Sequence, residues 1–249
     1  MKVRVIPTIL TDGTTVVKGE QFNNWRTVGS AEAIAKLYAR RNVDELLFLD
    51  VHARRNGRTI SEELIRVFSD VLDIPFAVGG GIDTYEDAAR CFRNGAEKVV
   101  LGSSAIENPI LISQIARGFG SQAVIISLDI RKNESNDLMI HSGRHLSSEV
   151  LDTFVPKIES LGGGEILLQN IERDGLMKGM DLKTIKSVAS MTNLPVIASS
   201  GCGSSEDAIS ALNSGASAIA AGAVFQFTQL TPLIIRESLK EAKFQTRLS

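Results

Sequence analysis

The chain is poor in the residues that build disulfide-rich and metal-binding proteins. Its 249 residues include 2 cysteines and 3 histidines, and the positions of Cys91 and Cys202 match no metal or redox spacing. We therefore expect two reduced thiols, no metal and no cofactor. The formal net charge of −2 gives no reason to expect nucleic acid or an anionic membrane surface as a partner.

Long apolar runs and aromatic residues are also scarce. The first residues, MKVRVIPTIL, are typical of a strand rather than a signal peptide, and no window approaches the roughly 20 apolar residues of a membrane span. The sequence therefore predicts a soluble, cytoplasmic protein. Aromatic residues make up 5% of the chain and hydrophobic residues 43%, which suits a barrel interior filled by aliphatic side chains.

Short apolar runs alternate with amphipathic helical stretches along the whole chain. The predicted strands are residues 3–9, 45–50, 76–78, 98–101, 123–129, 165–170, 196–199 and 218–221, and predicted helices include 31–40, 84–94 and 206–213. Such alternation favours a parallel sheet, and eight units favour closure. The sequence predicts an α/β fold, a single (β/α)8 TIM barrel over residues 1–249.

The two halves of the chain resemble each other. Residues 74–102 (IPFAVGGGIDTYEDAARCFRNGAEKVVLG) align without a gap on 194–222 (LPVIASSGCGSSEDAISALNSGASAIAAG), at a constant offset of 120. Two similar half-barrels, roughly 1–120 and 121–249, would produce this pattern.

The repeat pairs two sets of glycines at strand ends. Gly81 and Gly201 follow the third and seventh strands, and Gly102 and Gly222 follow the fourth and eighth. A missing Cβ lets backbone N–H groups approach an anion at a helix start. We therefore predict two phosphate cradles at the barrel mouth. The alternative is that these glycines only make tight strand-to-helix turns.

Several motifs resemble the cyclase subunit of imidazole glycerol phosphate synthase, the HisF family. They are VVKGEQF (16–22), DELLFLD (44–50), VGGGI (78–82), AIENP (105–109), ERDG (172–175) and GGGEILL (162–168). The resemblance implies a substrate with a phosphate at each end. It also implies a separate HisH-like glutaminase on the N-terminal face of the barrel, whose ammonia passes along the barrel axis.

The same resemblance implies which residues contact the substrate. Asp129, in ISLDIRK, is the catalytic carboxylate of the fifth strand. The positions that bind substrate or phosphate are Lys18, Asp50, Gly81, Gly102, Ser103, Asp174, Gly175, Ser200, Gly201 and Gly222. The loop that carries Lys18, Phe22 and Trp25 is a mobile lid in that family, and His141 and Arg144 lie in a segment, HSGRH, that is either a substrate-contacting loop or a solvated hairpin.

One departure separates the chain from the cyclases. Their first strand ends in an aspartate within a pattern like IPCLDVKDG, whereas this chain has IPTILTDGT, with Leu10 at that position. Two facing carboxyls act there as acid and base, and a leucine exchanges no proton. Asp12 either replaces the lost acid or caps an ordinary turn. Smaller departures are Gly102, the pair Gln169–Asn170 and the pair Ser199–Ser200.

A ring of charges matches that family residue for residue. Arg4, Glu45, Lys98 and Glu165 stand at strand starts and match the residues that surround the ammonia entrance. Two acids and two bases neutralise one another, which makes a half-buried layer tolerable. We expect an ammonia gate, and the alternative is a salt-bridge plug that only closes the barrel.

Three hypotheses for function follow. The first is a divergent HisF-like subunit that supplies ammonia for acetamidino sugars of surface polysaccharides, since Leu10 is typical of such paralogues. Its partners would be a glutaminase, a phosphorylated small molecule and a sugar-modifying amidotransferase. The second is the histidine-pathway cyclase itself, a lyase that relies on Asp129. The third is a barrel that serves only as an ammonia channel and scaffold.

Overall fold

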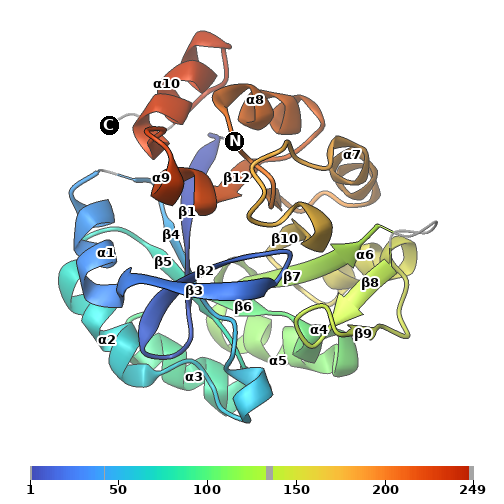
Figure 1. The fold of residues 1–249 in the computed structure, drawn as a ribbon. Coiled ribbons are helices and arrows are strands. Elements are labelled where there is room, and N and C mark those ends of the chain that lie inside the picture. Colours follow the sequence, from blue (N-terminus) through green and yellow to red (C-terminus); the bar gives the residue numbers. More distant parts are fainter. Residues whose placement is uncertain (1, 42, 133–136, 247–249) are drawn as a thin grey trace.

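Eight parallel strands close into a barrel in the computed structural model, which describes residues 2–41, 43–132 and 137–246. Figure 1 looks at the end of the barrel where these strands finish. In order around the barrel they are β1 (Arg4–Thr11), β4 (Leu46–Asp50), β5 (Phe76–Gly79), β6 (Lys98–Leu101), β7 (Val124–Arg131), β10 (Glu165–Asn170), β11 (Val196–Ser199) and β12 (Ala218–Ala221). Each pairs with the next, and β12 pairs with β1. The predicted (β/α)8 barrel is confirmed.

Helices surround the barrel (Figure 1). They are α1 (Ala31–Ala39), α2 (Glu62–Val71), α3 (Tyr85–Arg93), α4 (Ser103–Glu107), α5 (Ile110–Phe119), α6 (Leu151–Ser160), α7 (Leu182–Met191), α8 (Ser205–Asn213), α9 (Ala223–Phe227) and α10 (Pro232–Glu241). Short 3-10 turns are η1 (Arg54–Asn56), η2 (Ser121–Ala123) and η3 (Ile171–Arg173). Among residues 2–41, 43–132 and 137–246, no helix is long and apolar enough to cross a membrane.

The internal repeat is visible in local geometry. Thr84 caps the N-terminus of α3 and Ser204 caps that of α8, each in a capping box with an aspartate three residues on, Asp87 and Asp207. In such a box the two residues satisfy each other's free backbone N–H groups. Both boxes lie at the offset of 120 found in the sequence, so the two halves begin equivalent helices in the same way.

The apolar core has two parts because barrel strands alternate their side chains. One face packs against the helices, where Phe48 of β4 stacks on Phe68 of α2 at 3.5 Å between ring centroids. The other face fills the barrel lumen with aliphatic side chains, namely Ile6, Leu47, Ala77, Val100, Ile125, Leu167, Ile197, Ala218 and Ala220. The lumen is therefore apolar between its two ends.

Two β-hairpins that the strand count did not predict lie at the mouth. β1 continues to Thr11, past the predicted end at residue 9, and pairs with β2 (Thr15–Glu20), which pairs with β3 (Asn23–Ser30). The β2–β3 hairpin crosses in front of the barrel in Figure 1. The second hairpin extends β7 with β8 (Asp137–Ile140) and β9 (His145–Leu146). Residues 141–145 thus lie in a hairpin, and their contact with a substrate stays a prediction.

The two ends of the described chain meet at the N-terminal face. Val3, just before β1, forms a parallel bridge with Thr246, and its N–H donates to the carbonyl of Gln245 at 2.7 Å. Both ends therefore lie at the face opposite the two hairpins.

Candidate active site

The inward-facing residues of β1 show how polarity changes along the barrel axis. Arg4 belongs to the charged ring at the N-terminal end, and Ile6 belongs to the apolar lumen. Thr8 and Leu10, the next two inward positions, line the mouth at the other end. The period of 2 in a strand places these four side chains on one face. A single strand therefore contributes one residue to the charged ring, one to the apolar lumen and two to the mouth.

The four charged residues form a closed ring. Arg4 pairs with Glu45 at 2.6 Å and with Glu165, and Lys98 pairs with Glu45 at 2.8 Å and with Glu165 at 2.6 Å. Burial raises the pKa of Glu165, but hydrogen bonds and charge from Arg4 and Lys98 outweigh burial and leave this pKa below its usual value. The four side chains therefore meet one another, while their role as a gate stays a prediction.

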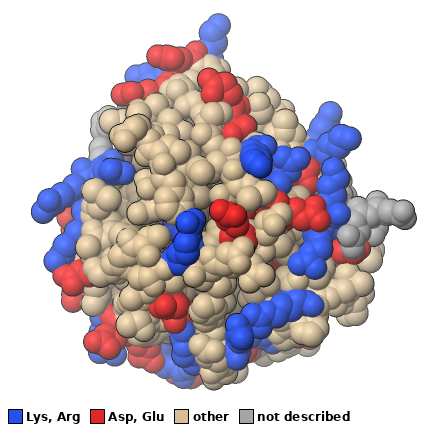
Figure 2. Space-filling view, in the orientation of Figure 1, with Lys and Arg blue, Asp and Glu red and all other residues tan. Residues whose placement is uncertain are grey.

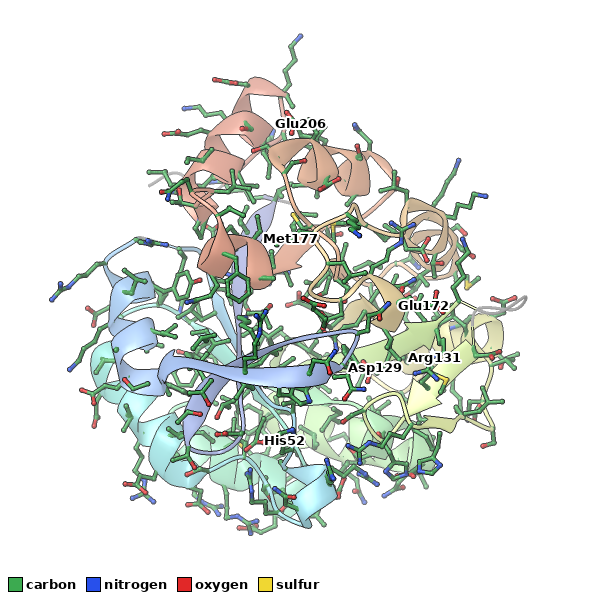
Figure 3. All side chains as sticks on the ribbon, in the orientation of Figure 1. His52, Asp129, Arg131, Glu172, Met177 and Glu206 are labelled. Atoms are coloured by element: carbon green, nitrogen blue, oxygen red, sulfur yellow. The ribbon has the colours of Figure 1, made fainter. Side chains whose placement is uncertain are left out.

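Asp129 of β7 lies near the middle of the mouth in Figure 3, whereas Glu206 lies on the outer helix α8. The Oδ1 atom of Asp129 accepts hydrogen bonds from Gln169 Nε2 at 3.0 Å and from Ser127 Oγ at 3.3 Å. Burial raises the pKa of Asp129 to about 6, against the lowering effect of these two hydrogen bonds. A carboxyl with a pKa near neutrality suits acid–base chemistry.

Leu10 occupies the rim of β1 without any group that exchanges protons. It pairs in register with Leu49 of β4 and Val17 of β2. Asp12, two residues on, caps its own turn: its carboxylate accepts from the N–H groups of Thr14 at 3.0 Å and Thr15 at 2.8 Å. Burial raises the pKa of Asp12, but these hydrogen bonds outweigh it and the net pKa is low. The contacts therefore favour the turn interpretation of Asp12 over replacement of the lost acid.

Lys18 extends from the β2–β3 hairpin into the mouth. The residue is 5% exposed, and its Nζ donates to the carbonyl of Thr8 at 2.8 Å. Burial lowers the pKa of Lys18 to about 8, although the charge of Asp174 opposes this shift. Burial raises the pKa of Asp174 to about 6, against the opposing charge of Lys18.

The tip of the same hairpin is docked across the mouth. The N–H of Gln21 donates to the carbonyl of Asp174 at 2.9 Å, and the Gln21 amide donates to the carbonyl of Glu172 at 3.0 Å. Gly175 has a φ of +73°, and a Cβ there would overlap the carbonyl of Gly19. The hairpin that carries Lys18 therefore covers the loop after β10.

The mouth contains two pockets of similar size, about 620 and 630 Å³ with open solvent included. The Lys18 pocket is lined by Thr8, Leu10, Lys18, Gly19, Phe22, Gln169, Asp174, Gly175, Met177, Ser199–Cys202 and Ala220–Ala223. The Asp129 pocket is lined by Leu49–Val51, Arg54, Gly79–Asp83, Val100, Gly102–Ser104, Ser127, Asp129 and Ser142. Figure 2 shows acidic and basic side chains near the centre of this face as well as around its edge. Each half-barrel thus provides most of one pocket.

The repeated glycines have packing reasons that the sequence does not reveal. A Cβ on Gly81 would overlap the backbone of Arg58, and one on Gly201 would overlap the carbonyl of Gly179. Gly222 leaves the space that the Lys18 Nζ occupies, whereas a Cβ on Gly102 would meet nothing within 4 Å. Close backbone approach is therefore sufficient to explain the first two, and phosphate binding at all four stays a prediction.

Asp50 and Ser103 both line the Asp129 pocket but have partners already. Arg58 forms an ion pair with Asp50, and a guanidinium nitrogen of Arg58 also donates to the carbonyl of Asp12 at 2.7 Å. Ser103 Oγ accepts from the N–H of His141 at 2.8 Å. Through Arg58, Asp50 at the end of β4 is thus linked to the turn after β1.

Other polar groups at the mouth were not identified from the sequence. Thr8 Oγ1 is the buried side-chain oxygen without a hydrogen-bond partner among the described residues. Arg54 forms ion pairs with Asp83 and Glu107, and Glu107 also contacts His141 Nε2 at 2.9 Å. The inward period of β1 could have identified Thr8, because it lies two residues from Leu10, but the Arg54 contacts join segments that no spacing relates.

No group of three or more histidine, cysteine, aspartate or glutamate side chains within residues 2–41, 43–132 and 137–246 is placed to hold a metal ion. Burial raises the pKa of both Cys91 and Cys202 to about 12, so these thiols are poorly ionised.

Comparison with known proteins gives a consistent result over nearly the whole chain. A sequence model described as histidine biosynthesis protein matches residues 4–231. The imidazole glycerol phosphate synthase subunit HisF of Dictyoglomus thermophilum is 36% identical over 247 residues, 98% of each chain. The subunits of the same name from Thermotoga sp. (strain RQ2) and Clostridium botulinum (strain Okra) are each 38% identical, over 98% of this chain and 97% and 98% of their own.

Proposed function

Since this chain belongs to the histidine biosynthesis protein family, and within it to the HisF subunits, we propose that it is the synthase subunit of a glutamine amidotransferase complex. The whole chain, 1–249, acts as one barrel. A HisH-like glutaminase binds its N-terminal face and releases ammonia, and the barrel carries this ammonia to a phosphorylated small molecule at the mouth. The complex works in the cytoplasm.

Two features support an axial path for ammonia. The ring of Arg4, Glu45, Lys98 and Glu165 closes the N-terminal end with four mutual ion pairs. Beyond it lies a lumen of aliphatic side chains, in which neutral ammonia is favoured over ammonium because burying a charge without a partner is costly. An opening of the ring would admit ammonia and delay its protonation.

The observation that carries the finer proposal is Leu10. The side chain of Leu10 lines the mouth, and Asp12 holds its own turn instead of facing a substrate. Asp129 therefore works without a second carboxylate from β1. We propose a paralogue that serves amidination of surface-polysaccharide sugars, with a sugar-modifying amidotransferase as a further partner. The second candidate is the histidine-pathway cyclase, which the near-neutral pKa of Asp129 favours.

An assay with added ammonium salt separates these candidates, because it needs no glutaminase. We expect conversion of the histidine-pathway ribonucleotide to be about 10²–10⁴-fold slower than in an ordinary cyclase, the usual cost of losing one member of an acid–base pair. Leu10→Asp should raise this rate, whereas Leu37→Asp, at an exposed position of α1, should not.

If the wild type converts the ribonucleotide at the rate of an ordinary cyclase, the proposal of a sugar-amidination paralogue is refuted and the chain is the histidine-pathway cyclase. A barrel that stays inactive after Leu10→Asp, yet still binds the glutaminase, would support a channel and scaffold instead.

A further inference from the structure

The two pockets at the mouth have no lining residue in common. Gln169 of β10 lines the Lys18 pocket, and Asp129 of β7, its partner in register, lines the Asp129 pocket. The boundary between the pockets therefore runs between these two neighbouring strands, at the level of this pair.

Gln169 is fixed at this boundary by hydrogen bonds. Its side-chain nitrogen donates to Ser127 Oγ at 3.1 Å and to Asp129 Oδ1 at 3.0 Å, which uses both of its N–H groups. The residue is 8% exposed. A bond to a carboxylate is stronger than one between neutral groups, so displacing the Gln169 side chain would cost two bonds and leave Asp129 poorly solvated.

The two pockets differ in the cations that they offer to a ligand. In the Asp129 pocket, Arg54 is paired with Asp83 and Glu107, and Arg58 beside it is paired with Asp50. In the Lys18 pocket, the Lys18 ammonium donates to a neutral carbonyl. Among the described residues it has no ion pair within 4.0 Å, and Asp174 acts on it only at longer range.

The Lys18 pocket also contains an unsatisfied hydroxyl. Thr8 Oγ1 is buried without a hydrogen-bond partner in the described chain, although Thr8 lines this pocket. A buried polar group that lacks a partner is unfavourable until a ligand or water supplies one. Thr8 and Lys18 lie side by side, since the Lys18 Nζ binds the carbonyl of Thr8.

We propose that the barrel binds its substrate by one phosphate only, in the Lys18 pocket, and that Gln169 is the specificity-determining partition that keeps a second phosphate of the same ligand out of the Asp129 pocket. This inference rests on the proposed function for its phosphorylated substrate. It replaces the two equivalent cradles that the sequence repeat predicts with one anion site, at the β11–β12 side of the mouth.

Calorimetric titration of the barrel alone tests the partition, with ribose 5-phosphate and ribulose 1,5-bisphosphate as probes. A ligand held at both ends gains about 10²–10⁴-fold in affinity from its second contact. We expect the wild type to bind the two probes within about threefold of each other, and to bind one inorganic phosphate per chain. Gln169→Thr should favour the bisphosphate by at least tenfold. Lys18→Met should weaken the monophosphate by at least tenfold, whereas Lys36→Met, at an exposed lysine of α1, should not.

Several results would overturn the proposal. They are a wild type that prefers the bisphosphate by a factor of 100, two inorganic phosphates bound with similar affinity, no phosphate binding at all, or a Lys18→Met variant that binds as the wild type does. If Gln169→Thr does not fold, Gln169→Ala tests the same preference for the bisphosphate, and the number of inorganic phosphates bound by the wild type tests whether there is one anion site. If no glutaminase binds the barrel, the proposed function is refuted, but the results of these titrations do not change because they use the barrel alone.

Discussion

Replacing Asp129 with asparagine should stabilise the protein at alkaline pH. Asparagine keeps an oxygen that accepts hydrogen bonds from Gln169 and Ser127 but carries no charge. Burial raises the pKa of Asp129 from 3.8 to about 6, so the folded state holds this carboxyl more readily in its protonated form. Well below pH 3.8 the carboxyl is neutral in both states, and its penalty grows as pH rises from about 4 to about 6 and is constant above that range.

The size of the effect follows from the two pKa values. A pKa that is 3.8 in the unfolded chain and about 6 in the folded protein corresponds to roughly 3 kcal/mol in the free energy of unfolding above pH 7. Asp129→Asn should therefore gain about 2–3 kcal/mol over the wild type at pH 8 and little at pH 4. Urea unfolding at pH 4, 6 and 8 measures this difference.

Asp12→Asn provides a control with the opposite sign. The hydrogen bonds of Thr14 and Thr15 leave the pKa of Asp12 low, so its contribution to stability is present at neutral pH and is lost as pH falls through that low pKa. The Asp12→Asn variant should be less stable than the wild type at pH 8. If Asp129→Asn is no more stable than the wild type at pH 8, or if its gain is the same at every pH, then Asp129 is not a strained, desolvated carboxylate and the argument for its acid–base role is lost.

Two further predictions concern the ring and the Lys18 pocket. Lys98→Glu leaves three carboxylates facing Arg4, so we expect glutamine-dependent function to fall while function on added ammonium persists. Lys98→Arg keeps the positive charge and should retain glutamine-dependent function. If Lys98→Glu uses glutamine as well as the wild type does, the ring is only a structural plug. Gly222→Ala places a methyl group against the Lys18 Nζ and should lower the melting temperature of the protein. In Gly102→Ala the added methyl group meets no other atom within 4 Å, so the melting temperature should not fall. Equal changes in melting temperature for the two variants would contradict this prediction.

The barrel was predictable because its signal is local and repeated. The strand starting at Glu165 and ending at Asn170, for example, is predicted with the bounds that the structure has. The β2–β3 hairpin was missed because β3 is largely exposed and its pairing with β2 contains register shifts at Val16/Val17 and Lys18/Glu20. A strand of this kind lacks the alternation of polar and apolar residues that identifies strands in a sequence.

At the candidate site, the sequence is informative where a residue departs from the family that the chain resembles. The resemblance places a catalytic aspartate at position 10, and a leucine there cannot exchange a proton. The partners of Asp50 and Gln169 were not predictable, because ion pairs and hydrogen bonds between strands depend on how the sheet closes. Likewise, a glycine in a sequence shows that a Cβ is absent but not which atom approaches, and at Gly222 that atom is the Lys18 Nζ.

The bridge between Val3 and Thr246 places both described chain ends beside the entrance formed by the charged ring. A glutaminase fused to either end through a short flexible linker would thus be tethered at a high local concentration, millimolar for short linkers, next to the face that the proposal assigns to it. Fusion is the natural design for a one-chain amidotransferase from this barrel. A purification tag at either end would occupy the same space, so binding studies need the tag removed.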